Sequence, residues 1–171
     1  MNVVDFPQLH IEPLTESNLA AASEFLFASW HGYYDAMLPR AIVDERTPAY
    51  FTKYLGGKKD LAWLAVLGQR IVAVITVSAN CIEELWVDKK YQRRKIGSAL
   101  VDTAMGHFRR RGYAAVQTGF ERFNSSARGF FSSMDWREIG SEYVELEPGK
   151  RVLALVYSTN LNASPAGRAI S

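Results

Sequence analysis

The sequence has a single cysteine, no long apolar run and almost no net charge, and each absence excludes a class of protein. Cys81 alone cannot form an internal disulfide, which is typical of a reducing compartment. No stretch is long and apolar enough to cross a bilayer as a helix, and the first residues lack the pattern of a secretory signal. A net charge of +2 means that affinity for an anion must come from a local patch. We therefore expect a cytoplasmic protein that is not bound to a membrane.

The amino-acid composition and the length are typical of a soluble globular protein. Hydrophobic residues make up 48% and charged residues 22% of 171 positions, a length that suits one domain with a sizeable core. We expect this single domain to cover residues 1–158. The small, polar residues 159–171 are predicted to form a disordered C-terminal tail.

Hydrophobic periodicity predicts an α/β (α+β) fold with about seven strands. The expected strands cover residues 9–13, 61–67, 71–78, 81–87, 114–120, 136–147 and 152–157. The expected helices cover residues 18–30, 41–55, 96–111 and 124–134. Thr15 or Ser17 is the expected N-cap of the first helix, and Gly32 and Pro39 are expected to break an aromatic connection after it. The order of elements predicts a mostly antiparallel sheet with a central parallel strand–helix–strand unit and helices on both faces.

The stretch from Glu83 to Gly112 gives the strongest chemical signal. A strand ends in Leu85, Trp86 and Val87, and a basic turn follows it. A helix then begins near Gly97, with an apolar stripe of Ile96, Leu100, Ala104 and Phe108. The first turn of a helix presents unpaired backbone N–H groups to an anion, and small residues let a phosphate come close. The alternative is a solvated basic loop before an ordinary surface helix.

Residues 87–100 resemble the acyl-CoA-binding motif of the GNAT superfamily of N-acetyltransferases, Q/R-x-x-G-x-G/A. Gln92 and Gly97 fit the outer positions, and Lys95 stands where the first glycine is usual. Either the turn needs no positive φ at that position, or Lys95 adopts one at some energetic cost.

A second segment, Asn124 to Trp136, resembles the GNAT pattern N-x-x-A-x-x-F-Y-x-x-x-G-F. Asn124, Ala127 and Phe130 match it, and the segment falls the usual distance after the first motif. Three positions depart from the pattern. Phe131 replaces the tyrosine often assigned to protonating the leaving thiolate, Asp135 replaces the glycine, and Trp136 replaces the phenylalanine. The resemblance covers roughly residues 9–158.

The resemblance implies acetyl transfer from acetyl-CoA to an amine by direct attack in a ternary complex, with no metal. Backbone groups of the strand end would hold the pantetheine arm, and the turn 93–98 would hold the diphosphate. The residues assigned to acetyl-CoA are Leu85, Trp86, Val87, Gln92, Arg93, Arg94, Lys95, Ile96, Gly97, Ser98, Asn124, Ala127 and Phe130.

An alkylammonium must lose a proton before it attacks, so a general base is expected. Glu83 and Glu84 are the candidates, and strand alternation allows only one to face the site unless a bulge intervenes; we favour Glu83. Glu121 is a further candidate. His31 is a weaker one, as is His107, which we expect to be exposed.

The usual acid position, Phe131, lacks a hydroxyl. Ser132, Tyr143 or water could take its place.

The acceptor is predicted only as an amine of unknown identity. Trp30, Tyr33 and Tyr34, with His31 and Asp35, form either a substrate wall or an ordinary packed hinge. An acyl-CoA-binding module with little catalysis is an alternative function. Nucleic-acid binding is disfavoured because the clusters Lys89–Lys95 and Arg109–Arg111 lie about 20 Å apart along one helix. We expect a monomer or a homodimer.

Overall fold

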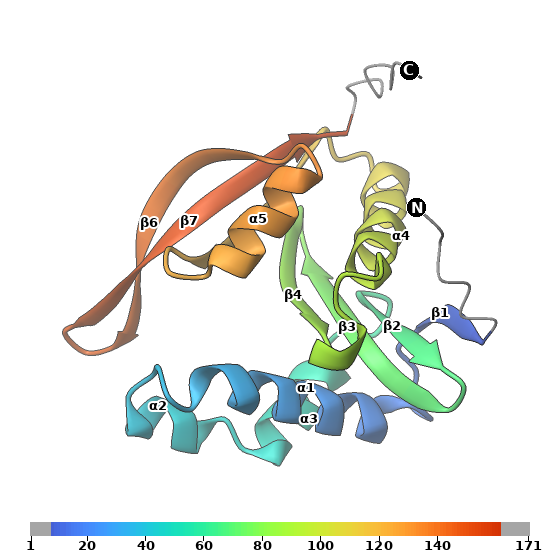
Figure 1. Cartoon of the computed structure of the whole chain (residues 1–171), viewed down its shortest axis with the longest axis horizontal. Helices are drawn as coiled ribbons and strands as arrows, with labels where there is room; N and C mark the ends of the chain where they lie inside the picture. The colour runs from blue at the N-terminus through green and yellow to red at the C-terminus, as the bar shows by residue number, and fades with distance from the viewer. Residues whose placement is uncertain (1–7, 162–171) are drawn as a thin grey trace. The chain divides into compact units, whose positions relative to one another are not determined.

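The computed structural model describes residues 8–161, and Figure 1 labels their helices and strands. The strands are β1 (Leu9–Pro13), β2 (Ala62–Leu67), β3 (Arg70–Ser78), β4 (Cys81–Val87), β5 (Ala115–Glu121), β6 (Arg137–Glu147) and β7 (Lys150–Asn160). The α-helices are α1 (Leu19–Tyr34), α2 (Arg40–Glu45), α3 (Pro48–Gly56), α4 (Ile96–Arg110) and α5 (Ser125–Ser133), and a 3₁₀ turn, η1, covers Lys89–Tyr91.

The predicted mixed sheet is confirmed. Seven strands follow the order β1-β2-β3-β4-β5-β7-β6, and β4 and β5 form its parallel pair, with Cys81 opposite Gln117 and Ile82 opposite Thr118. The pairs β1–β2, β2–β3, β5–β7 and β6–β7 are antiparallel. Gly68 turns between β2 and β3 with φ +63°, and Gly149 turns between β6 and β7 with φ +82°, conformations that suit glycine.

The described chain gathers into two compact units, each of which is treated by itself below. The first comprises residues 8–78 and 83–104, and the second comprises residues 79–82 and 105–161. The single domain expected over residues 1–158 stays a prediction. Within residues 8–161, no helix is both long and apolar enough to span a membrane.

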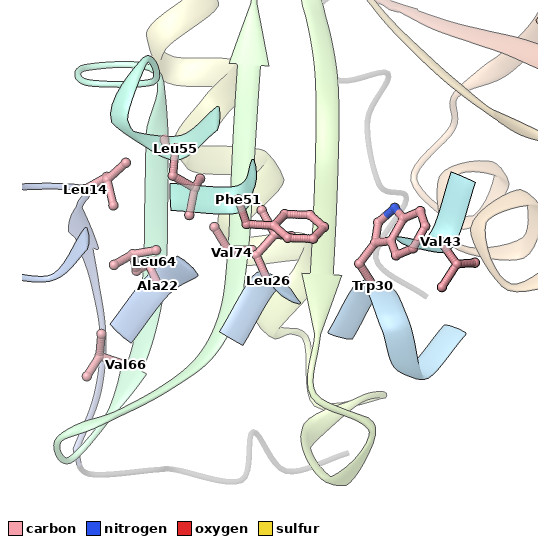
Figure 2. Close-up of a cluster of buried hydrophobic side chains, with 11 residues drawn as sticks. Leu14, Ala22, Leu26, Trp30, Val43, Phe51, Leu55, Leu64, Val66 and Val74 are labelled. Atoms are coloured by element: carbon pink, nitrogen blue, oxygen red, sulfur yellow. The ribbon is translucent and has the colours of Figure 1, made fainter. Parts of the chain in front are cut away.

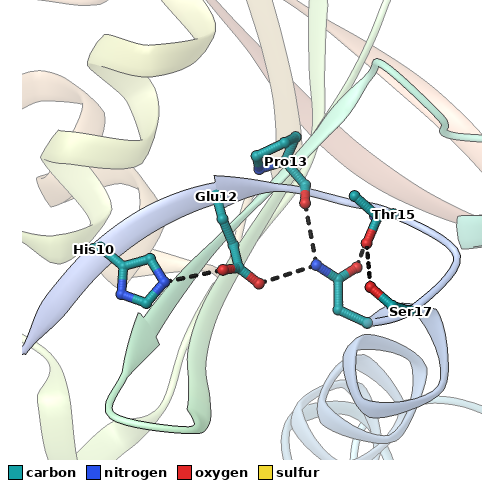
Figure 3. Close-up of polar contacts among 6 residues, drawn as sticks. His10, Glu12, Pro13, Thr15 and Ser17 are labelled. Carbon is teal, nitrogen blue, oxygen red and sulfur yellow. Dashed lines mark hydrogen bonds and ion pairs between the residues drawn. The ribbon is translucent and has the colours of Figure 1, made fainter.

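In the first unit, α1 begins at a polar junction with β1 (Figure 3). The expected N-caps were wrong: Asn18 occupies the N-cap position and uses its side chain to hold the preceding turn. Its Oδ1 accepts from the Thr15 N–H at 2.7 Å, and its Nδ2 donates to Glu12 at 3.0 Å. Hydrogen bonds from His10 and then from Asn18 lower the pKa of Glu12. The chain therefore enters α1 at a fixed angle.

Helix α1 continues to Tyr34, so the predicted break at Gly32 was wrong. A lone glycine in a helix costs only about 1 kcal/mol, which surrounding packing overcomes. The helix expected over residues 41–55 is instead two helices, because Pro48 starts α3 and Thr47 caps it, accepting from the Tyr50 N–H at 3.2 Å. These differences place the aromatic segment on a rigid helix.

The core of the first unit lies where α1 and α3 pack side by side next to β3 (Figures 1 and 2). Leu26 and Leu55 are completely buried, as is Val74 on β3. Trp30 and Phe51 complete the aromatic part of this core, with 7% and 2% exposure. Burying each large side chain contributes about 1.5–3 kcal/mol, so this layer holds the helices firmly in place.

The helix α4 confirms its predicted stripe, because Ile96, Leu100, Ala104 and Phe108 are all buried. The expectation for His107 was wrong: only 8% of it is exposed. Burial, Arg111 and Arg110 lower the pKa of His107.

The second unit contains β5, α5 and the long hairpin β6–β7. Strand β7 extends to Asn160, which pairs with Ala115, so Thr159 and Asn160 belong to the sheet and not to the expected tail. Leu161 is also ordered, because it is buried and its N–H donates to the Ala114 carbonyl at 2.9 Å, and residues 162–171 of that predicted tail lie outside the described residues.

Candidate functional site

The turn between β4 and α4 is built by local hydrogen bonds within the first unit. Asp88 caps η1, accepting from the Lys90 N–H at 3.0 Å, and Arg70 donates to its other oxygen at 3.2 Å. Gln92 donates from Nε2 to the Val87 carbonyl at 3.0 Å, which ties the turn back to the end of β4. Gln92 therefore stabilises the turn through this hydrogen bond.

Two residues of this turn adopt left-handed backbone conformations. Arg93 and Lys95 both have φ +63°, which resolves the alternative left open above: Lys95 takes the positive φ at the usual glycine position. Left-handed residues in a turn direct successive N–H groups toward one side and so make a concave anion site. The side chains of Arg93, Arg94 and Lys95 are exposed around it.

Helix α4 begins directly after Lys95. The Ala99 N–H donates to the Lys95 carbonyl at 3.0 Å. The preceding N–H groups, those of Ile96 to Ser98, have no acceptor within the helix because they belong to its first turn. Ile96 and Gly97 are buried, so the helix start is fixed while its N–H groups remain directed outward along the axis. This arrangement can bind a phosphate or diphosphate.

The favoured base, Glu83, lies in a polar cluster in the same unit. Its Oε2 accepts from the Tyr54 hydroxyl at 2.9 Å and forms an ion pair with Lys58. The Tyr54 oxygen also lies 2.8 Å from the hydroxyl oxygen of Thr76, which is fully buried. Burial is the main cause that raises the pKa of Tyr54, and Glu84 and Glu83 raise it further. Glu83 contacts Tyr54 and Lys58, whereas Glu84 accepts from Trp86, so the two neighbouring glutamates have different partners.

Glu84 is hydrogen-bonded to Trp86, which packs in an aromatic cluster with Tyr33 and Tyr34. Trp86 donates from Nε1 to Glu84 Oε2 at 2.6 Å, and its ring centroid lies 5.9 Å from those of Tyr33 and Tyr34 on α1. The two tyrosine rings are themselves 4.7 Å apart and perpendicular. Trp30, by contrast, belongs to the buried core. Of the three residues predicted to contact the acceptor, Tyr33 and Tyr34 are half-exposed beside a carboxylate, and Trp30 is sealed.

In the second unit, Asn124 is the N-cap of α5. Its Oδ1 accepts from the Ala127 N–H at 3.0 Å, which leaves its Nδ2 as a donor. Ala127 and Phe130 are half-buried on this helix. Asn124 can therefore cap the helix through Oδ1 and donate to a ligand through Nδ2.

Phe131 lies in an aromatic cluster of the second unit. It is 4% exposed and stacks on Phe120 at 5.9 Å, with Phe130 at 5.1 Å and Trp136 at 5.0 Å between ring centroids. Trp136 thus fills the phenylalanine position of the family pattern as a core residue. Phe131 has no proton to donate, and packing is the role that its surroundings show.

The remaining candidates are dispersed. His31 uses both ring nitrogens, contacting Asp35 at 2.7 Å and the Arg46 carbonyl at 2.6 Å. Glu121 closes β5, and Tyr143 is 69% exposed on β6. Ser132 is exposed on α5.

An open hollow of 370 Å³ in the second unit is lined by Arg122, Arg128, Glu138, Ser141, Leu153 and Leu155. Of the two motif segments it contains only Arg128, at a position that the family pattern leaves unspecified, so we do not assign it to the cofactor. In the part of the chain that the structure describes, no group of three or more His, Cys, Asp or Glu side chains could hold a metal ion.

Sequence reasoning missed Tyr54 and Lys58. They lie 29 and 25 positions before Glu83, Tyr54 on α3 and Lys58 in the turn after it, and neither belongs to a motif. Only the packing of α3 beside the sheet brings them to the carboxylate.

Comparison with known proteins gives a consistent family. The profile of the Acetyltransferase (GNAT) family matches residues 24–136. No curated protein matches.

Several solved structures share the fold. The PaiA N-acetyltransferase from Thermoplasma acidophilum, in complex with coenzyme A, is 15% identical with a TM-score of 0.67, over 89% of this chain and 98% of that one. The ribosomal-protein-S18-alanine N-acetyltransferase from Escherichia coli is 19% identical with a TM-score of 0.63, over 95% and 99%. RimL, a ribosomal L7/L12 alpha-N-protein acetyltransferase in complex with coenzyme A, is 17% identical with a TM-score of 0.71, over 92% and 96%.

Proposed function

Because the chain belongs to the acetyltransferase (GNAT) family and is therefore an acyltransferase, we propose that it transfers an acetyl group from acetyl-CoA to a primary amine. The acceptor is a small molecule or a peptide N-terminus. The amine attacks the thioester directly in a ternary complex, and no metal takes part.

The observation that carries the proposal is the turn before α4. Two left-handed residues, Arg93 and Lys95, precede a helix start at which Gly97 is buried, and three cationic side chains surround it. Backbone N–H groups, the helix dipole and the cations together favour a diphosphate. The residues of the second motif, Asn124, Ala127 and Phe130, are assigned to the cofactor through the family pattern alone.

Acetyl-CoA supplies the activated acetyl group, and the protein must supply a base and a place for the amine. Glu83 is the proposed base, acting directly or through water, because an alkylammonium near pKa 10 is not nucleophilic at neutral pH. Tyr33, Tyr34 and the Glu84–Trp86 pair form a surface suited to a cationic amine, since aromatic rings and carboxylates both attract a cation.

The test is release of coenzyme A thiol from acetyl-CoA in the presence of a panel of primary amines and short peptides. Thiol release that depends on the amine supports transfer. Tight binding of acetyl-CoA without amine-dependent release would instead support an acyl-CoA-binding module with little catalysis, which the missing tyrosine at Phe131 makes the second candidate.

A further inference from the structure

We propose that Tyr54 and Lys58 are positioning residues that hold one oxygen of Glu83 so that the other oxygen accepts the proton of the acceptor amine. This rests on the proposed function, because it takes Glu83 to be the base. It deepens that function by assigning a role to two residues that neither motif contains.

The geometry of the carboxylate is asymmetric. Both contacts that Glu83 makes with described residues fall on Oε2: the Tyr54 hydroxyl at 2.9 Å and the ammonium of Lys58. Oε1 has no hydrogen-bond partner among residues 8–161. A carboxylate held by one oxygen has a fixed plane, and its second oxygen keeps its lone pairs for a proton.

The polarity of the hydrogen-bond chain follows from proton counting. A carboxylate can only accept, so the single proton of Tyr54 points to Glu83. The hydroxyl of Thr76, at 2.8 Å, must then donate to the Tyr54 oxygen. Burial and the neighbouring glutamates raise the pKa of Tyr54, so it stays a donor at every working pH. The fully buried Thr76 thereby anchors the chain to β3.

Lys58 is well placed for a lasting contact. Only 13% of its side chain is exposed, and its ammonium lies 5.2 Å from the centre of the Tyr54 ring. The Glu83 side chain is 34% exposed, so it can still meet a substrate or a water molecule. The next residue, Lys59, is exposed and forms no ion pair with any of residues 8–161, which provides a matched control on the same turn.

In the reaction, the lone pair on Glu83 Oε1 takes one proton from the substrate ammonium, directly or through water. The neutral amine nitrogen then forms the new C–N bond as the C–S bond of the thioester breaks. The electron pair of that bond leaves with the sulfur, and the resulting thiolate takes up the second proton that the nitrogen loses, directly or through water. Tyr54 and Lys58 exchange no proton in this step and act only by orienting Glu83.

Steady-state kinetics of five variants test the proposal. Glu83→Gln removes the base and should lower kcat by about 10²–10⁴-fold at pH 7. Tyr54→Phe combined with Thr76→Val removes both members of the buried hydroxyl pair, so no buried hydroxyl is left unsatisfied. This double variant and Lys58→Met should each lower kcat by about ten- to a hundredfold, with the KM for acetyl-CoA unchanged. Lys58→Arg should restore most of the rate, and Lys59→Met should match the parent.

The pH profile separates positioning from a structural role. As pH rises toward the pKa of the amine, near 10, the acceptor loses its proton unaided and needs no base. The rate deficits of Glu83→Gln, of the Tyr54/Thr76 double variant and of Lys58→Met should all shrink with pH. A variant that is merely less well folded would stay equally deficient.

Two results overturn the proposal in different ways. Parental activity of Glu83→Gln would remove the base assignment, and the proposed function would need another base. A crippled Glu83→Gln beside fully active Tyr54 and Lys58 variants would sink the positioning roles alone. If no amine in the panel is accepted, a double-mutant cycle with Tyr54→Phe and Glu83→Gln, measured by unfolding, still tests the contact. A severalfold departure of the unfolding equilibrium constant from additivity supports the contact, and full additivity refutes it.

Discussion

The two motif segments of this chain each place a charged residue where the family pattern has a glycine, and the two residues differ in chemistry. Lys95, before α4, has φ +63°, and Asp135, after α5, has φ +64°. Aspartate visits this region readily because its short side chain bonds locally, whereas a long side chain gains no such compensation. The backbone geometry is therefore kept in both segments, and its energetic cost is greater in the first.

The two motif segments also differ in how their side chains are surrounded. The segment before α4 exposes its cations, and we propose that it binds the diphosphate through backbone N–H groups at a helix start where Gly97 is buried. The segment around α5 is held by aromatic packing, with Phe131 and Trp136 each 4% exposed. A segment that binds through its backbone tolerates new side chains poorly at close approach. A segment that packs through its side chains should be more sensitive in stability than in binding.

The largest effect is expected from Gly97→Asp. It adds both bulk and a negative charge at the helix start where we place the diphosphate, so acetyl-CoA affinity should fall about a hundredfold or more. Gly129→Asp is the matched control on α5, because a Cβ at Gly129 meets nothing within 4 Å. Calorimetric titration with acetyl-CoA measures both.

Gly97 is buried, so the melting temperature of each aspartate variant must be measured alongside its affinity. Gly97→Ala helps if the aspartate fails to fold, since it adds bulk without charge and should weaken binding less. Unchanged affinity in a folded Gly97→Asp would place the diphosphate elsewhere.

The next largest effect is expected from Phe131→Tyr. The ring is enclosed by Phe120, Phe130 and Trp136, so a new hydroxyl without a partner should lower the free energy of unfolding by about 1–3 kcal/mol. Phe130→Tyr, at a half-buried position on the same helix, should be nearly neutral. Denaturant unfolding compares the two. Full stability together with faster single turnover in Phe131→Tyr would mean that the hydroxyl reaches the leaving sulfur.

Substitutions of Asn124 separate its role as a helix cap from its proposed contact with acetyl-CoA, and we expect smaller effects from them. Asn124→Ala removes the acceptor for the Ala127 N–H and should lower stability by about 1 kcal/mol. Asn124→Ser keeps a capping oxygen but loses the amide donor, so it should be stable while still raising the KM for acetyl-CoA. Parental kinetics in a stable Asn124→Ser would show that the residue is a helix cap and nothing more.

The sequence predicted the sheet well because alternation and turn residues act locally. The bounds of β1 and β4 were correct to the residue, and the buried stripe of α4 followed from its period. The errors arose where packing overrode local signals, as at Gly32, which lies inside α1, and at His107, which is buried. Propensity gives only a weak prior at such positions.

The candidate site was predictable only in part. Its motif residues lie close together in the sequence. Because Lys95 stands where the family pattern has a glycine, the sequence also indicated that a positive φ was one of two possibilities there. The contacts of Glu83 with Tyr54 and Lys58 depend on how α3 packs, which no local pattern encodes. Long-range contacts of single side chains are therefore the part that required the structure.

The smallest effect should come from restoring the glycines. Lys95→Gly relieves a left-handed conformation that costs an L-residue about 1–2 kcal/mol, and the greater freedom of glycine in the unfolded chain offsets about half of that gain. We expect a net increase of about 0.5–1 kcal/mol in the free energy of unfolding. Asp135→Gly should change it by less than about 0.5 kcal/mol, because aspartate already tolerates the conformation. Lys95→Ala, which removes the cation but keeps the strain, isolates the backbone contribution. Equal gains from both glycine substitutions in denaturant unfolding would mean that the identity of the residue at positive φ does not distinguish the two segments.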